Sequence, residues 1–383
     1  MLVEIREGTV IHNRFEVRRY IGGGGFGTVW HAFDNDLQRE VAIKRLRAAS
    51  SFHSVKREDV IEEARKIALL SHPNIVSVYD VIEYEGEPLI FMEFLQGGTL
   101  HDYLREMCRA GGWVSAIESV RLLRGILLGL NEAHTCERGP IIHKDLKPLN
   151  ILFDKSRQPK IADFGLAAIG SVQQIQTANP GKWEHEGTMG YKSPEQLIGA
   201  QMDQRSDLFN VGLIAYLLFA AAHPFIDQRF LFEYKEMVIE PYRNLPAVSA
   251  ENLPAEVGEF IASLLAVNPA DRFKSTAEAL SELEHVEGRF QDLMLQRSLD
   301  FLKAILAGNP SEAPTAEELA ESILLCKRKG LHEEGALLYE RSGTDFSELS
   351  EDAKARLEED YRVCKRRMEQ EKKREGQERA TAV

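Results

Sequence analysis

The feature that most constrains the fold of this 383-residue chain is a change of hydrophobic periodicity at residues 96–98, Gln-Gly-Gly. Before this point, residues 15–20 alternate as strands do, residues 28–33 and 40–46 are strand-like, and residues 59–71 carry a single helical stripe. After it, apolar residues recur at helical spacing in residues 120–133, 211–221 and 257–267. The sequence therefore predicts an α+β fold, with a small antiparallel β lobe that holds one helix and a larger helical lobe.

Two further strands and two turns are expected before residue 96, and one short strand is expected after it. Residues 75–81 and 88–94 are strand-like and are separated by a turn at Glu85-Gly86, and Ile141-Ile142 forms a short strand. Glycines are dense between residues 22 and 27, which predicts a hairpin turn between two of the first strands.

A charged helical extension is expected beyond about Gly288, after a linker or sharp helix break at residues 307–314. Thr315 and Glu318 have capping-box spacing, and Gly330 should end the helix that they begin. Further helices are expected over residues 333–340 and along a face formed by Leu357, Tyr361, Cys364 and Met368. The expected parts are an N-terminal lead (1–14), a small lobe (15–95), a large lobe (96–287) and a helical extension (288–383).

Charge, apolar stretches and cysteine spacing argue against several classes of protein. A formal charge of −13 provides no overall basic field for nucleic acid or for an anionic membrane. The longest apolar stretch, residues 211–222, is too short to span a bilayer, and the N-terminus lacks a signal-peptide pattern. The cysteines, which are Cys108, Cys136, Cys326 and Cys364, lack the spacing of a disulfide framework or a zinc site. We therefore expect a cytoplasmic protein without a membrane span or a nucleic-acid partner.

Two motifs in the expected small lobe suit a phosphate site. Residues 22–29 read Gly-Gly-Gly-Gly-Phe-Gly-Thr-Val, and a hairpin without side chains lets backbone N–H groups approach phosphate oxygens. Taken alone, the glycines are also compatible with a flexible turn. Lys44 follows the apolar residues 41–43 on an expected strand. Such a lysine needs an anion, which Glu63 in the next helix can supply.

A polar loop follows the expected strand at residues 141–142. Residues 143–150 read His-Lys-Asp-Leu-Lys-Pro-Leu-Asn, which brings Asp145, Lys147 and Asn150 close together in sequence. Asp163 follows the apolar pair 161–162 after a short hairpin. A carboxylate and an amide that face one space suit Mg²⁺, because this ion prefers oxygen ligands.

In this order, the motifs resemble those of the eukaryotic-type (Hanks-type) serine/threonine protein kinase family, in a bacterial-like form. The resemblance covers about residues 15–284 and rests on the glycine loop, Val41-Ala-Ile-Lys44, His143–Asn150, Asp163-Phe-Gly165 and Ser193-Pro-Glu195. It implies a bilobal kinase fold that transfers the γ-phosphoryl group of Mg-ATP (Mn²⁺ can replace Mg²⁺) to protein hydroxyls, with autophosphorylation. Lys147 after Asp145, and Gly187-Thr188 before Ser193, are similar to the serine/threonine branch.

The resemblance implies a role for each matching residue. Lys44 is expected to bind the α- and β-phosphates and to pair with Glu63. Asp145 is expected to orient the substrate hydroxyl and accept its proton, while Lys147 neutralises charge on the transferred group. The expected metal ligands are Asn150 and Asp163. The expected nucleotide-binding residues are Ile21, Gly22, Gly24, Gly27, Val29, Ala42, Lys44, Met92, Glu93, Leu95 and Leu152, with the backbone of residues 93–95 bonded to adenine.

The resemblance also implies supporting contacts. Glu195 is expected to pair with Arg272, and Asp207 is expected to anchor the catalytic loop. Four side chains are expected to stack as an internal column, namely Ile67, Val78, His143 and Phe164.

One departure from the family bears on regulation. The family usually has arginine before the catalytic aspartate, where it binds a phosphorylated activation-loop residue, and this chain has Lys144. Lysine cannot form the bidentate contact of a guanidinium with phosphate. Activation through phosphorylation of Ser171, Thr177 or Thr188 therefore stays an open hypothesis.

The competing functional hypothesis is a catalytically weak, pseudokinase-like scaffold that binds ATP and signals through its C-terminal helices. The complete set of catalytic side chains argues against it, whereas Lys144 and the long extension are compatible with it. The expected partners are protein substrates, with a partner protein or self-association through the helices of residues 288–383 as a second kind of interaction.

Overall fold

The structure is a computed structural model that describes residues 5–24, 27–46, 66–85, 87–164, 190–220, 254–307, 313–347 and 349–381. The chain divides into two compact units, Met1–Leu283 and Glu284–Val383. Several residues named above lie outside the described residues, namely Glu63, Gly165, Ser171, Thr177, Gly187 and Thr188.

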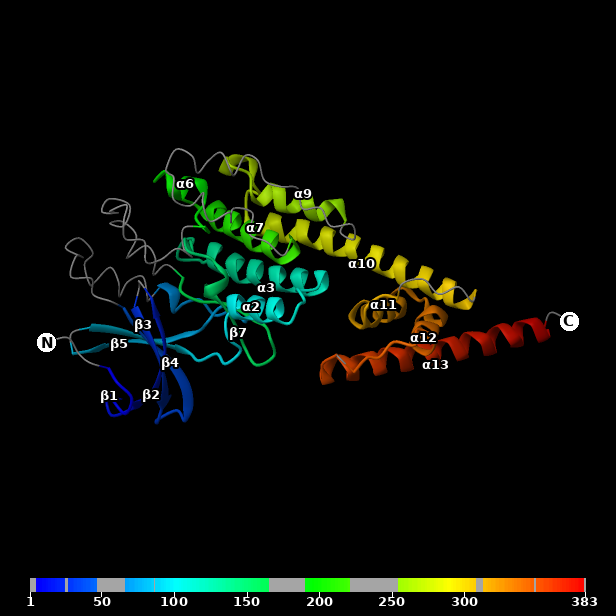
Figure 1. Ribbon diagram of the computed structural model, residues 1–383, viewed down its shortest axis with the longest axis horizontal. Helices are drawn as coiled ribbons and strands as arrows, with labels where there is room; N and C mark the ends of the chain where they lie inside the picture. Colours follow the sequence, from blue (N-terminus) through cyan, green and yellow to red (C-terminus); the bar gives the residue numbers. More distant parts are fainter. Residues whose placement is uncertain are drawn as a thin grey trace. The chain divides into compact units, whose positions relative to one another are not determined.

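A six-stranded antiparallel sheet forms the small lobe (Figure 1). Its strand order is β1-β2-β3-β4-β6-β5. Its strands are β1 (Val10–Ile11), β2 (Phe15–Gly24), β3 (Gly27–Asp34), β4 (Arg39–Leu46), β5 (Val78–Tyr84) and β6 (Glu87–Glu93). Val41 and Ile43 of β4 point into a core shared with Phe15, Val17 and Phe91. Because side chains alternate along a strand, Ala42 and Lys44 lie on the opposite face of β4. Both are also buried, at 6% and 4% exposure.

Two of the predicted strands differ from the structure: one begins later than expected, and the other segment is not a strand. The strand expected at residues 75–81 begins only at Val78, because the segment before it bonds to the large lobe. The Val76 N–H donates to the Ile161 carbonyl at 2.9 Å, and Ile75 forms an isolated parallel bridge with Ile161. The Ile141-Ile142 pair is not a strand, since the Ile141 N–H donates to the Ala133 carbonyl at a helix end.

The large lobe is helical around one small hairpin. Its elements are α2 (Leu100–Arg109), α3 (Ala116–His134), η1 (Pro148–Asn150), β7 (Ile151–Phe153), β8 (Pro159–Ile161), α6 (Pro194–Leu197), α7 (Gln204–Ala220), α9 (Ala255–Leu264), η3 (Pro269–Asp271) and the first residues of α10 (Thr276–Leu306), most of which belongs to the second unit. The helix expected at residues 120–133 lies within α3, and the helices expected at residues 211–221 and 257–267 are present as α7 and α9, although α9 ends at Leu264 and residue 221 lies outside the described residues.

A glycine lets α3 pack closely against the segment that leads to β5. A Cβ at Gly129 would lie 2.7 Å from the Asn74 carbonyl oxygen, which is far inside contact distance. The Asn74 carbonyl also accepts from the Ile161 N–H at 2.8 Å. Gly129 therefore helps to fix β8 and the residues that follow it, which include Asp163. The helix α10 continues through Gly288, so the expected boundary at that residue falls inside a helix.

The second unit contains α11 (Ala316–Lys329), α12 (His332–Arg341) and α13 (Glu351–Thr381). The expected capping box of Thr315 and Glu318 is confirmed, and Gly330 ends α11 with a left-handed φ of 75°. Cys326 of α11 and Cys364 of α13 are both fully buried against Gly335 of α12. Burial raises the pKa of the Cys326 thiol to about 12 and also raises the pKa of Cys364.

None of the described helices has both the length and the apolar character that a membrane crossing needs.

Candidate active site

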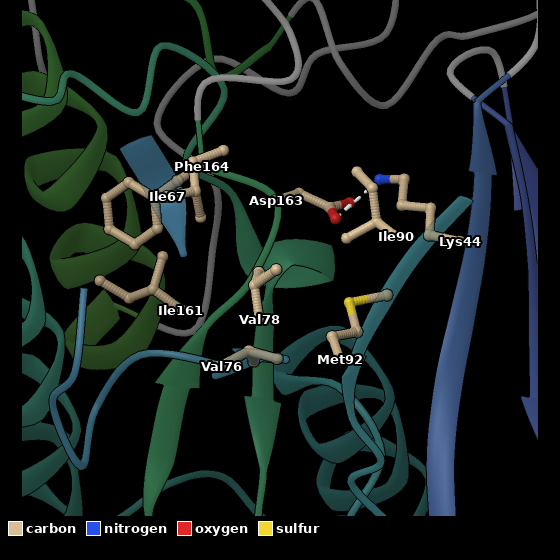
Figure 2. Close-up of a pocket in the computed structure, with 9 residues that line it drawn as sticks. All are labelled: Lys44, Ile67, Val76, Val78, Ile90, Met92, Ile161, Asp163 and Phe164. Carbon is tan, nitrogen blue, oxygen red and sulfur yellow. Dashed lines mark ion pairs between the residues drawn. The ribbon is translucent and has the colours of Figure 1, made fainter. Parts of the chain in front are cut away.

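Lys44 forms an ion pair with Asp163 across the space between the lobes. Its Nζ lies 2.7 Å from Asp163 Oδ1, as the dashed line in Figure 2 shows. Burial by itself would raise the pKa of Asp163, but the charge and hydrogen bond of Lys44 outweigh it, so the pKa is lowered. Asp163 is therefore anionic at neutral pH. The sequence predicted that Lys44 needs an anion but named Glu63, which lies outside the described residues.

The backbone around Asp163 is anchored to the catalytic loop. The Ala162 N–H donates to the Asn150 carbonyl at 2.9 Å, and the His143 Nε2 hydrogen-bonds to the Ala162 carbonyl at 2.8 Å. Asp163 itself has a left-handed φ of 64°. This conformation turns its carboxylate toward Lys44 while Phe164 next to it packs in the interior at 1% exposure.

An apolar pocket lies behind this ion pair. Figure 2 shows the residues that line it, which are Lys44, Ile67, Val76, Val78, Ile90, Met92, Ile161, Asp163 and Phe164. Three members of the expected internal column, Ile67, Val78 and Phe164, are among them, and the Phe164 ring lies 4.8 Å from the His143 ring. The low polarity of these walls strengthens the attraction between Lys44 and Asp163.

The catalytic loop brings three of the expected site residues together. Lys147 Nζ lies 2.7 Å from Asp145 Oδ2, and the Asn150 amide donates to the Asp145 carbonyl at 2.7 Å and to Oδ2 at 3.3 Å. Lys147 and Asn150 are 7% and 8% exposed. Because the Asn150 nitrogen bonds to Asp145, the amide oxygen is the atom of Asn150 that is suited to a cation.

Asp207 binds the backbone at the start of this loop. Its carboxylate accepts from the backbone N–H groups of His143 at 2.7 Å and Lys144 at 2.8 Å, and it contacts His134 Nε2 at 2.8 Å. Burial would raise the pKa of Asp207, but the His134 hydrogen bond and the nearby charges lower it. The contacts agree with the anchoring role that the resemblance implies.

Glu195 and Arg272 form a buried bidentate ion pair. Arg272 Nη1 and Nη2 donate to the two Glu195 oxygens at 2.8 Å and 2.9 Å, and the side chains are 0% and 6% exposed for Arg272 and Glu195. The Ser206 hydroxyl adds a bond of 2.6 Å to Glu195. Burial would raise the pKa of Glu195, but Arg272 and Ser206 lower it.

We expect these two carboxylates to make the fold sensitive to acid. The folded-state pKa values of Asp207 and Glu195 lie below their ordinary values of 3.8 and 4.5. Their stabilisation is therefore complete above the ordinary values and is lost as pH falls through the lowered folded-state values. Urea unfolding of the chain at several pH values below 5 should give a steadily smaller unfolding free energy. The slope should be shallower in Glu195→Gln, and a pH-independent stability would contradict this account.

The strand register places several of the expected nucleotide-binding residues opposite one another on neighbouring strands. Val29 lies opposite Gly22 of β2 and opposite Lys44 of β4, and Ala42 lies opposite Met92 of β6. The glycine hairpin expected from the sequence is present, with Gly24 opposite Gly27. Ile21 is exposed on β2, Leu95 follows β6, and Leu152 lies on β7. The glycine turn and Lys44 thus share one region of the sheet.

The sequence did not predict an ion pair between Glu93 and Lys160 at the connection between the lobes. The Glu93 carboxylate accepts from Lys160 Nζ at 3.0 Å and from the Ser77 N–H at 3.3 Å. Lys160 lies on β8, directly opposite Leu152. The side chains of Lys160 and Glu93 are 12% and 23% exposed, so this ion pair is largely shielded from water. No local pattern links these two positions, which are 67 residues apart.

Comparisons with known proteins agree with this arrangement. The family model described as "Protein kinase domain" matches residues 15–324. The serine/threonine-protein kinase PksC of Streptomyces coelicolor is 33% identical over 283 residues, which is 73% of this chain and 50% of PksC. PknL of Mycobacterium bovis is 32% identical over 283 residues, which is 73% of this chain and 67% of PknL.

The fold has a counterpart among solved structures. The crystal structure of the Mycobacterium tuberculosis PknI kinase domain superposes with a TM-score of 0.57 at 25% identity, over 74% of this chain and 100% of that chain. The chain spans between 39% and 67% of the length of the curated relatives that it matches. It belongs to the protein kinase family, and its fold is the bilobal fold of a protein kinase domain.

Proposed function

We propose that this chain transfers the γ-phosphoryl group of Mg-ATP to serine and threonine hydroxyls of protein substrates, its own included. The observation that carries the proposal is the convergence of Asp145, Lys147 and Asn150 in one hydrogen-bonded loop, with Asp163 held by Lys44. In this family the phosphoryl group is transferred through a loose transition state, so positioning and charge supply most of the acceleration.

The proposed roles follow from where the side chains lie. Asp145 orients the acceptor hydroxyl and takes its proton at a carboxylate oxygen. Lys147, already at 2.7 Å from that carboxylate, lies next to the reacting groups and neutralises charge on the transferred phosphoryl group. Lys44 binds the α- and β-phosphates, and its pairing with Glu63 remains part of the proposal.

The donor set fits a divalent cation that nucleotide and protein hold together. Asp163 offers a carboxylate, and Asn150 offers an amide oxygen. Mg²⁺ usually takes one or two protein carboxylates with water and phosphate oxygens, rather than a cage built by protein alone. In keeping with this, no group of three or more His, Cys, Asp or Glu side chains forms a metal site in the described ranges. When bound, Mg²⁺ or Mn²⁺ would supply positive charge between the phosphates.

To test the proposal, the purified 383-residue chain is incubated with ATP and Mg²⁺, and its phosphosites are identified by mass spectrometry. We expect phosphoserine and phosphothreonine on the chain and on a generic protein substrate. Transfer should be abolished by a metal chelator and in Lys44→Ala, which lacks the ammonium that binds the phosphates. Nucleotide binding without transfer in the wild type would contradict the proposal and favour the scaffold alternative.

The ion pair between Lys160 and Glu93 should affect nucleotide affinity. Lys160→Met leaves Glu93 partly buried without its cation, which loosens residues 93–95, where the adenine edge is expected to bind. We expect the KM for ATP to rise roughly threefold to tenfold while kcat changes less than about twofold. Steady-state kinetics measure both quantities. Lys160→Arg should restore affinity, whereas a matching rise in Lys155→Met, at an exposed turn, would contradict the explanation.

Protein substrates are the partners that this activity requires. We propose in addition that the helices of residues 288–383 bind a partner protein or a second copy of the chain. A cytoplasmic location suits the proposal, because ATP is the phosphoryl donor and Cys108, Cys136, Cys326 and Cys364 are all free thiols.

A further inference from the structure

The ring of His31 stacks on the ring of Phe94, at the start of the connection between the lobes. The two ring centroids lie 4.1 Å apart with an interplanar angle of 18°, so the rings are nearly parallel. His31 lies within β3, whereas Phe94 follows directly after the end of β6. Stacked rings stabilise an arrangement by more than the burial of their area alone. The stack therefore ties the first residue of the connection to the small lobe.

Glu40 of β4 orients the imidazole of His31. His31 Nε2 contacts one Glu40 carboxylate oxygen, and the other oxygen accepts from Arg18 Nη1 of β2 at 2.7 Å. The Arg18 guanidinium lies over the Phe33 ring, 4.3 Å from its centroid. The His31 side chain is only 12% exposed. Side chains from β2, β3 and β4 thus fix the ring that Phe94 meets.

The strand register places His31 beside the expected adenine site. His31 lies directly opposite Ala42 of β4, and Ala42 lies directly opposite Met92 of β6. Residues paired in this way point to the same face of an antiparallel sheet. His31 therefore lies on the face that carries Ala42 and Lys44, next to a residue that is expected to cover adenine.

Contacts with the large lobe hold the connection on either side of Phe94. Lys160 of β8 binds the Glu93 carboxylate at 3.0 Å, and the Gly97 N–H donates to a carbonyl of β7 at 3.0 Å. The stack holds Phe94 from the opposite lobe. If the stack were lost, the backbone of residues 93–95 would be free to shift away from the face that covers adenine.

We propose that His31 is a positioning residue for ATP, which holds Phe94 and thereby sets the position of the backbone of residues 93–95. The inference rests on the proposed function, because that backbone is expected to bond to adenine. Without the stack, ATP must order this backbone as it binds, and the ordering reduces its affinity. The catalytic loop takes no part in the stack, so turnover of the bound complex changes little.

The test separates the ring of His31 from its bond to Glu40. The 383-residue chain is studied as wild type, His31→Ala, His31→Gln and His31→Phe. Calorimetry gives the Kd of a non-hydrolysable ATP analogue with Mg²⁺, and steady-state transfer gives kcat and the KM for ATP. We expect Kd and KM to rise about threefold to tenfold in His31→Ala and His31→Gln, with kcat within about twofold of wild type. Glutamine can still bond to Glu40 but has no ring.

His31→Phe keeps a ring for the stack and should restore Kd to within about twofold of wild type. His12→Ala is the matched control. His12 also meets an aromatic ring, edge-on to Tyr84 with 5.9 Å between the ring centroids, but it does so beside the start of β6 rather than its end. Its loss should leave Kd and KM unchanged.

Three outcomes overturn the inference: an unchanged Kd in His31→Ala, a rise in Kd for His31→Phe as large as for His31→Gln, or a fall of kcat in His31→Ala without a change in Kd. In the last case His31 would support the chemical step and not the adenine site. The two proposals fail separately. Wild-type transfer with equal Kd values in all variants overturns only the role of His31. The expected Kd pattern without any transfer by the wild type supports that role and contradicts the proposed function.

Discussion

Asp145→Asn is expected to lower the rate of phosphoryl transfer by roughly 10²–10⁴-fold, the range typical of losing a positioned general base. Asparagine has nearly the same shape as aspartate, and its amide oxygen can still accept the Lys147 hydrogen bond seen at 2.7 Å. The loop geometry therefore survives while the group that accepts the proton is lost. Nucleotide affinity should change less than about twofold, because Lys44 and Asp163 are untouched.

Single-turnover kinetics with saturating Mg-ATP measure the chemical step directly, and a fluorescent nucleotide measures affinity in the same preparation. Asp352→Asn, at an exposed position in the first turn of α13, is the matched control and should leave both values unchanged. A large loss of nucleotide affinity in Asp145→Asn would mean that Asp145 supports the fold of the site rather than the chemistry.

Arg272→Met is expected to cost about 3–5 kcal/mol of unfolding free energy, the range for removing one partner of a buried ion pair. The guanidinium donates to both Glu195 oxygens and also to the carbonyls of Ala266, Arg205 and Val267. Methionine fills much of the volume but satisfies none of these acceptors. The Glu195 charge then stays buried, with the Ser206 hydroxyl as a remaining partner.

Urea denaturation of the full chain, followed by fluorescence, tests this expectation. Arg297→Met provides the contrast, because the Arg297–Glu318 pair at 3.3 Å has 42% and 21% exposed side chains and should contribute less than about 1 kcal/mol. Adding Glu195→Gln to Arg272→Met should recover part of the loss, since no buried charge is then left alone. If both arginine variants lost the same small amount, the buried pair would not be a major source of stability.

The sequence predicted well those features that depend on nearby residues. The apolar spacing of α3 and α7, the Thr315 capping box and the Gly330 helix end are all local patterns, and each is present. The glycine hairpin is local as well, since Gly24 of β2 pairs with Gly27 of β3. In each case the pattern lies within a few neighbouring residues, so it can be recognised without knowledge of the tertiary structure.

Contacts between distant segments were harder to predict. The ion pair of Lys160 with Glu93 depends on how β8 packs beside the end of β6. The residues next to either position do not predict this contact. The start of β5 was misplaced for a similar reason, because Ile75 and Val76 have strand-like side chains but bond to Ile161 instead of to β6. Lys44 was correctly expected to need an anion, yet its described partner, Asp163, follows from the tertiary arrangement.

Because Cys326 and Cys364 are packed against Gly335, the rate at which they react with a thiol reagent can report local unfolding of the second unit. Alkylating reagents attack the thiolate, and both thiols are fully buried with raised pKa values, whereas Cys108 is exposed. The rate at which these two cysteines become labelled therefore follows the opening of α11, α12 and α13 rather than the chemistry of the reagent. Local unfolding of that unit can therefore be followed on the chain's own cysteines, without introducing a labelling site by mutation.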